Sequence, residues 1–260
     1  MDTVTLKSNS EIMSLSKSQL KGHWMEAAVV VFLFQLVASI TDLGFFDNLF
    51  RVSYVNIGGE YFKLDPNYYF KLLVTYLIMG PFMLGLSRFF LKFARNENPP
   101  IETFFSGLKQ FVPSMVLYII RAIFIFLWTL LLIIPGIIAY CKYSQAYFIL
   151  NDEPGLSSLD ALKKSTAMMD GYKAHYVVLC FSFIGWELLL YIVTIVLAYL
   201  FTAVGSIALG TIVLWLTAFI GQLVIDAYFN LSLANFYDNL KKYREQENYD
   251  STVIPESFSV

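Results

Sequence analysis

Long stretches without a charged residue alternate with short polar segments along the chain. A helix that crosses a lipid bilayer needs about 20 mostly apolar residues, so most of these stretches suit one crossing each. Residues 188–225 are too many for one crossing, because a single helix of that length would measure roughly 57 Å. We therefore predict a break near Gly205 or Gly210. The charge-free runs are 27–41, 72–87, 111–120, 122–141, 175–186 and 188–225.

The composition agrees with a membrane protein and excludes two other classes. Hydrophobic residues make up 57% of the 260 residues and charged residues 15%, and the mean hydropathy is +0.61. Soluble domains usually carry about 25% charged residues, so an ordinary water-soluble enzyme is excluded. The net charge of −2 also disfavours a nucleic-acid binder. The first expected partner is therefore the lipid bilayer.

The distribution of basic residues predicts the orientation. Lys and Arg are retained on the cytoplasmic side of a membrane, which places segments 1–23, 88–109, 163–173 and 241–244 inside. The loop at about 42–69 is mainly acidic and suits the outside. An even number of crossings between neighbouring inside segments gives about six transmembrane helices with both termini cytoplasmic.

The predicted fold is an all-α, polytopic membrane helical bundle. We assign a cytoplasmic N-terminal segment to residues 1–23, the bundle to residues 24–237 and a cytoplasmic tail to residues 238–260. In the first segment, Ser8 and Glu11 have capping-box spacing. Two interpretations remain open for this segment, a helix on the membrane surface or a mobile tail.

The third and fourth helices share residues 111–150, and their connection can be placed in two ways. A turn just before Pro135-Gly136 would leave the fourth helix short. A turn near Arg121 would instead make Pro135 a kink inside the fourth helix, which membrane helices tolerate.

An internal repeat emerges when the chain is shifted by 55 residues. Asn96-Glu97-Asn98-Pro99 then aligns with Asn151-Asp152-Glu153-Pro154, and Lys109 with Lys164. Each unit predicts a helix descending to the cytoplasm, a turn and a short amphipathic helix that returns the chain, which we call an elbow. Duplication would make this a parallel repeat, as in some transporters. The alternative is that two loops converged on the same turn chemistry.

Several stretches resemble one known family over about residues 17–237. The sequence resembles the bacterial multi-pass membrane proteins catalogued as domain of unknown function 975, and more loosely the membrane domain of some glycerophosphodiester phosphodiesterases. The first resemblance implies a bacterial cytoplasmic membrane protein without assigned activity, and it transfers no catalytic residues. Glu187 and the long apolar region 202–225 depart from the family pattern. The stretches that carry the resemblance are 127–138, 161–165, 168–173 and 182–186.

Charged residues inside the predicted spans are the best candidates for function, because each costs about 2.5 to 3.5 kcal/mol to insert. Arg121 and Glu187 fall at similar depths, so we hypothesise an ion pair between them. Lys142 and Asp226 form a second possible pair. Alternatively, Arg121 extends to the outer interface and Glu187 faces a polar pocket alone. Even a formed pair would be weak evidence of function.

Three functions compete. The first is a non-catalytic accessory or assembly module that meets membrane or cytosolic proteins through its elbows, with Lys163 and Lys164 as the docking residues. The second is a small-molecule or peptide exporter or permease with its site near Arg121 and Glu187. The third, a lipid-active enzyme, is disfavoured because the chain has only two histidines. We favour the first, and expect no catalytic residue, metal or cofactor.

Overall fold

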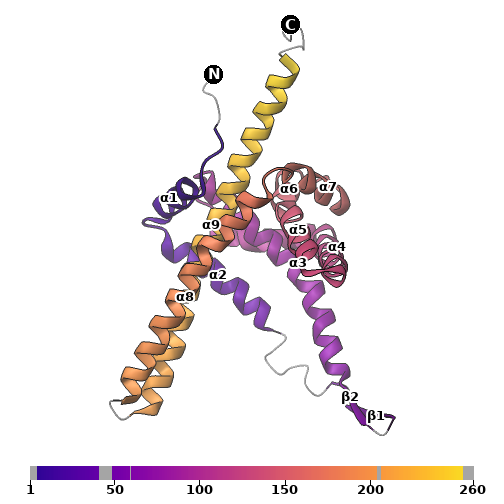
Figure 1. The fold of residues 1–260 in the computed structure, drawn as a ribbon, viewed down its shortest axis with the longest axis vertical. Helices are drawn as coiled ribbons and strands as arrows, with labels where there is room; N and C mark the ends of the chain where they lie inside the picture. Colours follow the sequence, from indigo (N-terminus) through magenta and orange to yellow (C-terminus); the bar gives the residue numbers. More distant parts are fainter. Residues whose placement is uncertain (1–4, 41–48, 59, 204–205, 254–260) are drawn as a thin grey trace.

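The computed structural model describes residues 5–40, 49–58, 60–203 and 206–253. These residues form an all-α molecule with one small β-hairpin, which confirms the predicted fold class (Figure 1). The elements are α1 (Asn9–Leu20), α2 (Trp24–Ser39), β1 (Ser53–Ile57), β2 (Glu60–Leu64), α3 (Pro66–Ala94), the 3-10 helix η2 (Ile101–Gln110), α4 (Phe111–Leu131), α5 (Ile133–Lys142), α6 (Ala146–Asp152), α7 (Ser158–Met168), α8 (Lys173–Ala203) and α9 (Ile207–Val253).

Four stretches of the described chain are long and apolar enough to cross a membrane. They are α3, the continuous helical stretch Ile101–Leu131, α8 and most of α9. The pair α1 and α2, bent by 102° where they meet, would make a fifth. The predicted fourth span falls on α5, which has only 10 residues, so length and composition alone do not support six spans among the described residues.

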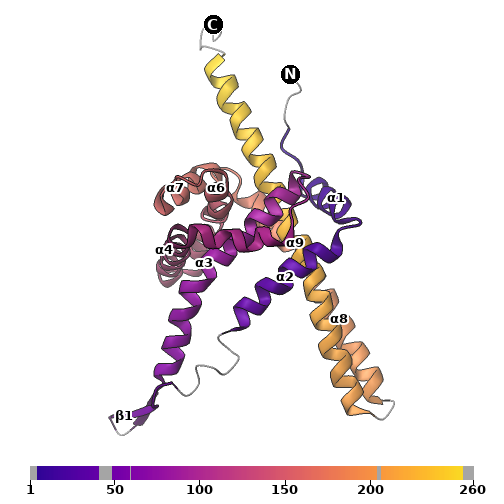
Figure 2. The ribbon, with the colours of Figure 1, turned by 180° about the vertical axis from the view of Figure 1, so that it is seen from behind.

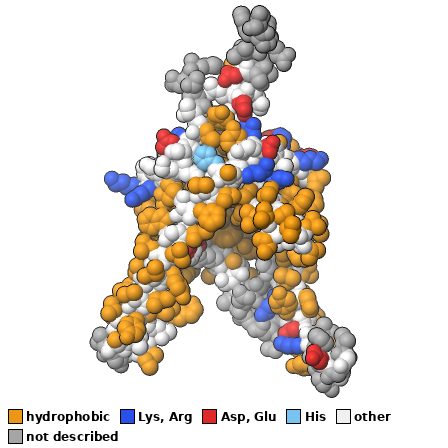
Figure 3. Space-filling model, in the orientation of Figure 1, with side chains coloured by type: hydrophobic (Ala, Val, Ile, Leu, Met, Phe, Trp, Pro, Cys, Tyr) orange, Lys and Arg blue, Asp and Glu red, His pale blue; other side chains and the backbone are white. Residues whose placement is uncertain are grey.

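The long helices diverge from a common packed region. The helix α8 and the first half of α9 run side by side as one arm, whereas α3 leads away to the β-hairpin and α2 lies between them (Figures 1 and 2). The last part of α9 extends beyond the packed region in the opposite direction. Charged side chains gather on the visible face at the level of α1, α6 and α7, while the arms are mainly apolar apart from the hairpin end (Figure 3).

Two glycines let α3 pack directly on η2. A Cβ atom on Gly85 would overlap the backbone carbonyl of Phe104, and one on Gly107 would overlap the carbonyl of Pro81. Helices in membranes use small residues in this way to bring backbones close together. The contact fixes the turn between α3 and α4, where Arg88 also donates to Asn151 of α6 at 2.8 Å.

The structure distinguishes the two placements of the connection between the third and fourth predicted helices. The helix α4 ends at Leu131, and Leu132 adopts extended dihedral angles before α5 begins. Pro135 therefore lies in the first turn of α5, where a missing backbone N–H is tolerated. Gly136 packs on Thr129 of α4, so the turn before Pro135-Gly136 is the one that forms. Arg121 lies within α4, away from this turn.

A second break separates α5 from α6. Ser165 of α7 reaches into it, donates its hydroxyl to the carbonyl of Lys142 (2.7 Å) and accepts from the backbone N–H of Gln145 (3.2 Å). These two bonds satisfy backbone groups that would otherwise be unpaired at the helix ends. The first repeat unit has the continuous helix α3 at the corresponding place, so the two units differ there.

The N-terminal segment packs on the bundle. Ser8 and Glu11 form the predicted capping box, and α1 contacts α9 through Asn235, which donates to Ser16 (2.9 Å) and Gln19 (2.7 Å). These contacts are inconsistent with a mobile tail at α1.

At the other end of the chain, α9 runs through position 238 without a break, so no structural boundary marks the predicted tail in the described residues.

The sequence predicts a break near Gly205 or Gly210 within residues 188–225. Gly205 lies outside the described residues. The helix α8 ends at Ala203, before Gly205, and α9 begins at Ile207, after it.

The predicted outer loop holds the antiparallel strands β1 and β2, in which Ser53 pairs with Leu64. Apolar and polar residues alternate around Gly58, a pattern that is typical of a β-hairpin. A prediction based on long apolar runs does not detect this pattern.

Candidate intramembrane binding site

A chain of polar side chains links three apolar helices. Gln222 of α9 donates from Nε2 to Glu187 Oε1 of α8 at 3.1 Å and to Asp226 Oδ1 of α9 at 3.0 Å. Gln35 of α2 donates from Nε2 to the other oxygen, Asp226 Oδ2, at 2.9 Å. We call these four residues the polar chain. Within the described residues, neither carboxylate forms an ion pair with Lys, Arg or His.

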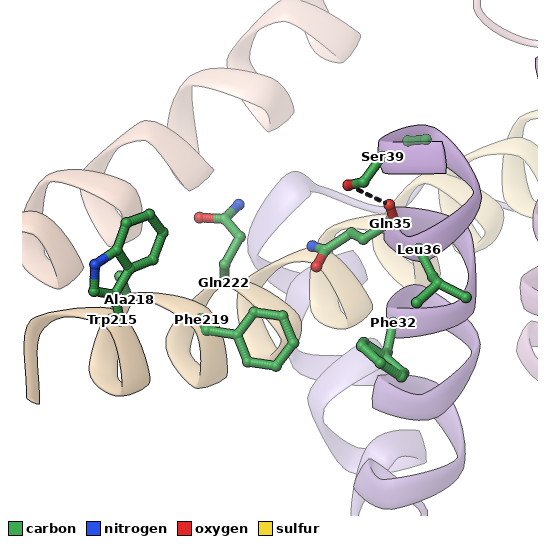
Figure 4. Close-up of a pocket in the computed structure, with 9 residues that line it drawn as sticks. Phe32, Gln35, Leu36, Ser39, Trp215, Ala218, Phe219 and Gln222 are labelled. Atoms are coloured by element: carbon green, nitrogen blue, oxygen red, sulfur yellow. Dashed lines mark hydrogen bonds between the residues drawn. The ribbon is translucent and has the colours of Figure 1, made fainter. Parts of the chain in front are cut away.

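The polar chain borders an open groove between α2 and α9. Gln35 and Gln222 point toward one another across it, and the aromatic rings of Phe32 and Phe219 lie nearby (Figure 4). The groove has a volume of about 560 Å³. Its wall is mainly apolar, so the two amide groups are the principal polar surface that a ligand in the groove would meet. The lining residues are Phe32, Gln35, Leu36, Ala38, Ser39, Trp215, Ala218, Phe219 and Gln222.

The polar chain lies within the long apolar helices. Glu187 is near the middle of α8, about 21 Å along the helix from Lys173. Asp226 lies about 28 Å from the start of α9, close to the full thickness of a bilayer core of about 30 Å, so it lies toward the far end of that span. An ionised carboxylate inside a span is costly unless it is compensated, and intramembrane charges usually mark a functional site.

The hypothesised pair of Arg121 and Glu187 does not form in the structure. Glu187 contacts Gln222 instead. The guanidinium of Arg121 lies over the rings of Tyr140 and Tyr147, 5.3 and 5.9 Å from their centroids. The position of each residue along its helix follows from the sequence, but the divergence of the helices directs the two side chains to different places.

The second hypothesised pair is absent as well. Lys142 lies 6.0 Å from the ring centroid of Trp128, and Asp226 is held by two glutamines. Gln35 and Gln222 carry no charge, so the pattern of charged residues within the apolar runs does not indicate them. Neutral amides in runs 27–41 and 188–225 were the signal that could have identified them.

A different cluster of charges, which we call the charged collar, is fully paired. Arg95 donates to Asp152 at 2.8 Å and to Asp238 at 2.9 Å. Lys241 lies 2.7 Å from Asp152, and Lys242 lies 2.6 Å from Asp238. The collar joins the turn after α3, the end of α6 and the later part of α9.

Asp152 shows the electrostatic effect of the collar. Burial by itself would raise the pKa of this carboxyl, but hydrogen bonds from Arg95, Lys241 and Tyr237 outweigh burial and lower the pKa to about 2. The ionised form is therefore strongly favoured in the folded protein. These contacts give the collar a structural role.

The predicted docking residues lie on the exposed face of α7. Lys163 pairs with Asp160 at 3.3 Å, and Lys164 pairs with Glu153 at 2.6 Å. All four side chains are about half exposed or more. Such pairs contribute little to stability, so both lysines remain available to a partner, and their docking role stays a prediction.

Within the described part of the chain, no group of three His, Cys, Asp or Glu side chains is arranged to hold a metal ion. His23 contacts Glu26 at 2.8 Å near the start of α2, and His175 packs against the ring of Phe236. Cys141 and Cys180 are free thiols.

Comparison with known proteins identifies a family but no activity. No curated protein matches the chain, and no solved structure matches it. The weaker likeness to the membrane domain of glycerophosphodiester phosphodiesterases is therefore not confirmed. One family model matches the chain in two overlapping segments, residues 1–141 and 129–244. The chain belongs to the family described as "Protein of unknown function (DUF975)".

Proposed function

We propose that the protein is a non-catalytic assembly module that binds the transmembrane segment of a partner protein in the groove between α2 and α9. The observation that carries the proposal is the polar chain, in which Glu187 and Asp226 are held by amides and by no cation of the described residues. The occupant that fits is an apolar helix with one basic residue at the depth of the carboxylates.

Charge complementarity supports a basic residue. Two carboxylates bridged by one amide, that of Gln222, repel each other when both are ionised. A Lys or Arg side chain entering from the groove would compensate them, and intramembrane charges are commonly paired in this way. Removing one member of such a pair is costly, which would make the contact selective.

The shape and lining of the groove support a helix. Ala38 of α2 and Ala218 of α9 are small residues on its two sides, and small residues let membrane helices approach closely. Trp215 is 69% exposed and Phe219 is 44% exposed. These rings offer apolar surface to an entering helix beside the glutamines.

The proposal includes an orientation in the membrane. We place the charged collar on the cytoplasmic side of a bacterial cytoplasmic membrane, and the β-hairpin outside. The support is that α1, α7 and the last part of α9 lie on the same side of the arms (Figure 1), and that these three segments carry basic residues, namely Lys17, Lys163, Lys164, Lys241, Lys242 and Arg244. Basic residues are retained in the cytoplasm, and both termini would then be cytoplasmic.

The test uses designed transmembrane peptides as probes. Three fluorescent leucine-alanine helices, with a central Lys, Leu or Glu, are titrated against the labelled full-length protein in phosphatidylcholine nanodiscs. We expect the Lys peptide to bind at least about tenfold more tightly than the Leu peptide, because only its charge complements the carboxylates. The Glu peptide should bind most weakly.

The double variant Glu187→Gln and Asp226→Asn provides the control. It keeps the side-chain volumes and removes the charges, so the preference for the Lys peptide should disappear. Equal affinity for the Lys and Leu peptides in the wild-type protein would contradict the proposal. An unchanged preference in the double variant would contradict the assignment of the site.

A permease for small organic cations is the second candidate. The observation in its favour is that the groove is open and is lined by Gln35 and Gln222, the two amides that donate to the carboxylates of the polar chain. Such a protein would carry a cationic dye into sealed proteoliposomes, and Asp226→Asn would abolish the flux. A binding module would hold the Lys peptide but leave the dye outside.

A further inference from the structure

A second polar site lies in the core, away from the groove. Residues from α3, α4, α5, α6, α8 and α9 line a small, partly open cavity of about 60 Å³. Arg121 of α4 contributes its charged guanidinium to the wall, and Tyr147 of α6 lies beside it. The other lining residues are Met83, Leu86, Ser87, Phe90, Tyr140, Ser144, Phe148, Tyr176, Asn230 and Leu233.

Two hydrogen-bond donors at this cavity are not used within the described residues. The buried Nε atom of Arg121 and the hydroxyl of Tyr147 make no hydrogen bond to any of them. The Tyr147 side chain is almost completely buried, since the residue is 3% exposed. Leaving a buried donor unpaired is costly, and more so when the donor is charged. Such groups therefore indicate a ligand that accepts hydrogen bonds.

The charge of the wall indicates the sign of that ligand. The lining residues include one guanidinium, three phenols, two serines and one asparagine, and no Asp or Glu. The aromatic rings of Tyr140 and Tyr147 stabilise the guanidinium through their faces, but they do not neutralise it. Charges inside membrane spans are commonly paired, and the lining offers the guanidinium no carboxylate.

We propose that the cavity binds a small inorganic anion, such as chloride, between Arg121 and Tyr147. The inference is independent of the groove and of its proposed occupant. A water-sized position requires about 10 to 15 Å³, so the cavity accommodates a monatomic anion with a few waters. It is too small for a phospholipid headgroup together with its glycerol. The anion would join α4 to α6 through the two donors and stabilise the core.

The test is the thermal unfolding of the purified full-length protein in increasing sodium chloride, with sodium gluconate keeping the ionic strength constant. Gluconate is too large for the cavity, so only chloride should raise the midpoint, with saturation. Tyr147→Phe removes one donor and keeps the ring. We expect it to raise the chloride concentration for half-maximal stabilisation about tenfold. Arg121→Gln should abolish the chloride response.

Tyr143→Phe is the matched control, because Tyr143 does not line the cavity and the same hydroxyl group is removed nearby. Its chloride response should equal that of the wild type. If Arg121→Gln fails to fold, the comparison of Tyr147→Phe with Tyr143→Phe decides whether the chloride response depends on the hydroxyl of Tyr147. Equal midpoints in chloride and gluconate for the wild-type protein would overturn the proposal, as would identical chloride responses in the two tyrosine variants.

A further arm distinguishes a free anion from the phosphate of a lipid. The titration is repeated in phosphatidylcholine and in phosphatidylglycerol nanodiscs. A chloride response of the same size in both lipids supports a free inorganic anion. If phosphatidylglycerol stabilises the protein and chloride then has no further effect, the proposal of a free inorganic anion is overturned.

Discussion

The charged collar and the polar chain both place carboxylates on α9, but they compensate them differently. In the collar, Asp238 contacts Arg95 at 2.9 Å and Lys242 at 2.6 Å. About three turns earlier on the same helix, the carboxylate of Asp226 accepts hydrogen bonds from the amides of Gln35 and Gln222 and contacts no cation of the described residues. The collar is complete within one chain, whereas the polar chain lacks a cation among the described residues. This difference separates a group that maintains the fold from a group that can receive a ligand.

The difference also has an energetic consequence. Removing one member of a partly buried ion pair leaves the other uncompensated and is strongly destabilising. Neutralising a carboxylate that has no cationic partner instead relieves the cost of burying its charge. Substitutions in the two regions should therefore have effects of different size, and even of opposite sign.

The largest effect is expected at Arg95. Arg95→Met keeps much of the side-chain volume but leaves Asp152 and Asp238 without their shared guanidinium. The free energy of unfolding should fall by about 3 kcal/mol, toward the lower limit for broken buried pairs because Arg95 is 29% exposed. Denaturant unfolding in detergent micelles would measure it. A loss below about 0.5 kcal/mol, the scale of an exposed pair, would show that the collar is not structural.

Acid should weaken the collar by a smaller amount. The pKa of Asp152 is lowered from 3.8 to about 2 in the folded protein, so the ionised form contributes stability at higher pH. That contribution is complete above about pH 5 and is lost as the pH falls through about 4 toward about 2. We expect a loss of about 2 kcal/mol, measured by unfolding across this acidic range. In Asp152→Asn this component of the pH dependence should be absent.

The smallest effect on stability is expected on α7. Replacing Lys163 and Lys164 with Glu breaks only exposed pairs, so the free energy of unfolding should change by less than about 1 kcal/mol. If the two lysines dock a cytosolic partner, recovery of the proteins that crosslink to the wild-type chain in its native membrane should nevertheless decrease. Unchanged recovery together with unchanged stability would remove α7 as a docking surface.

Local sequence rules predicted the parts of the fold that depend on neighbouring residues. The capping box at Ser8 and Glu11 forms because its two bonds span three residues. The sequence leaves two placements of the turn between α4 and α5 open, and the structure has the one in which Pro135 lies in the first turn of a helix. Apolar run length likewise located the long helices, but it overestimated how many are long enough to span.

The pairing of side chains between helices could not be predicted in the same way. Depth along a helix placed Arg121 and Glu187 at the same level, but partner choice depends on helix rotation and divergence, which hydropathy does not encode. Arg121 faces the core cavity and Glu187 faces α9. The site also depends on Gln35 and Gln222, neutral residues that charge patterning does not reveal.

The most direct test of the central claim compares two substitutions on one helix. Asp226→Asn and Asp238→Asn are identical changes, measured by unfolding of the full-length protein at neutral pH. We predict that Asp238→Asn lowers the free energy of unfolding by about 2 kcal/mol, since it breaks the pairs with Arg95 and Lys242. Asp226→Asn should leave it unchanged or raise it. A loss at Asp226 as large as that at Asp238 would contradict the distinction between a paired collar and an uncompensated binding site.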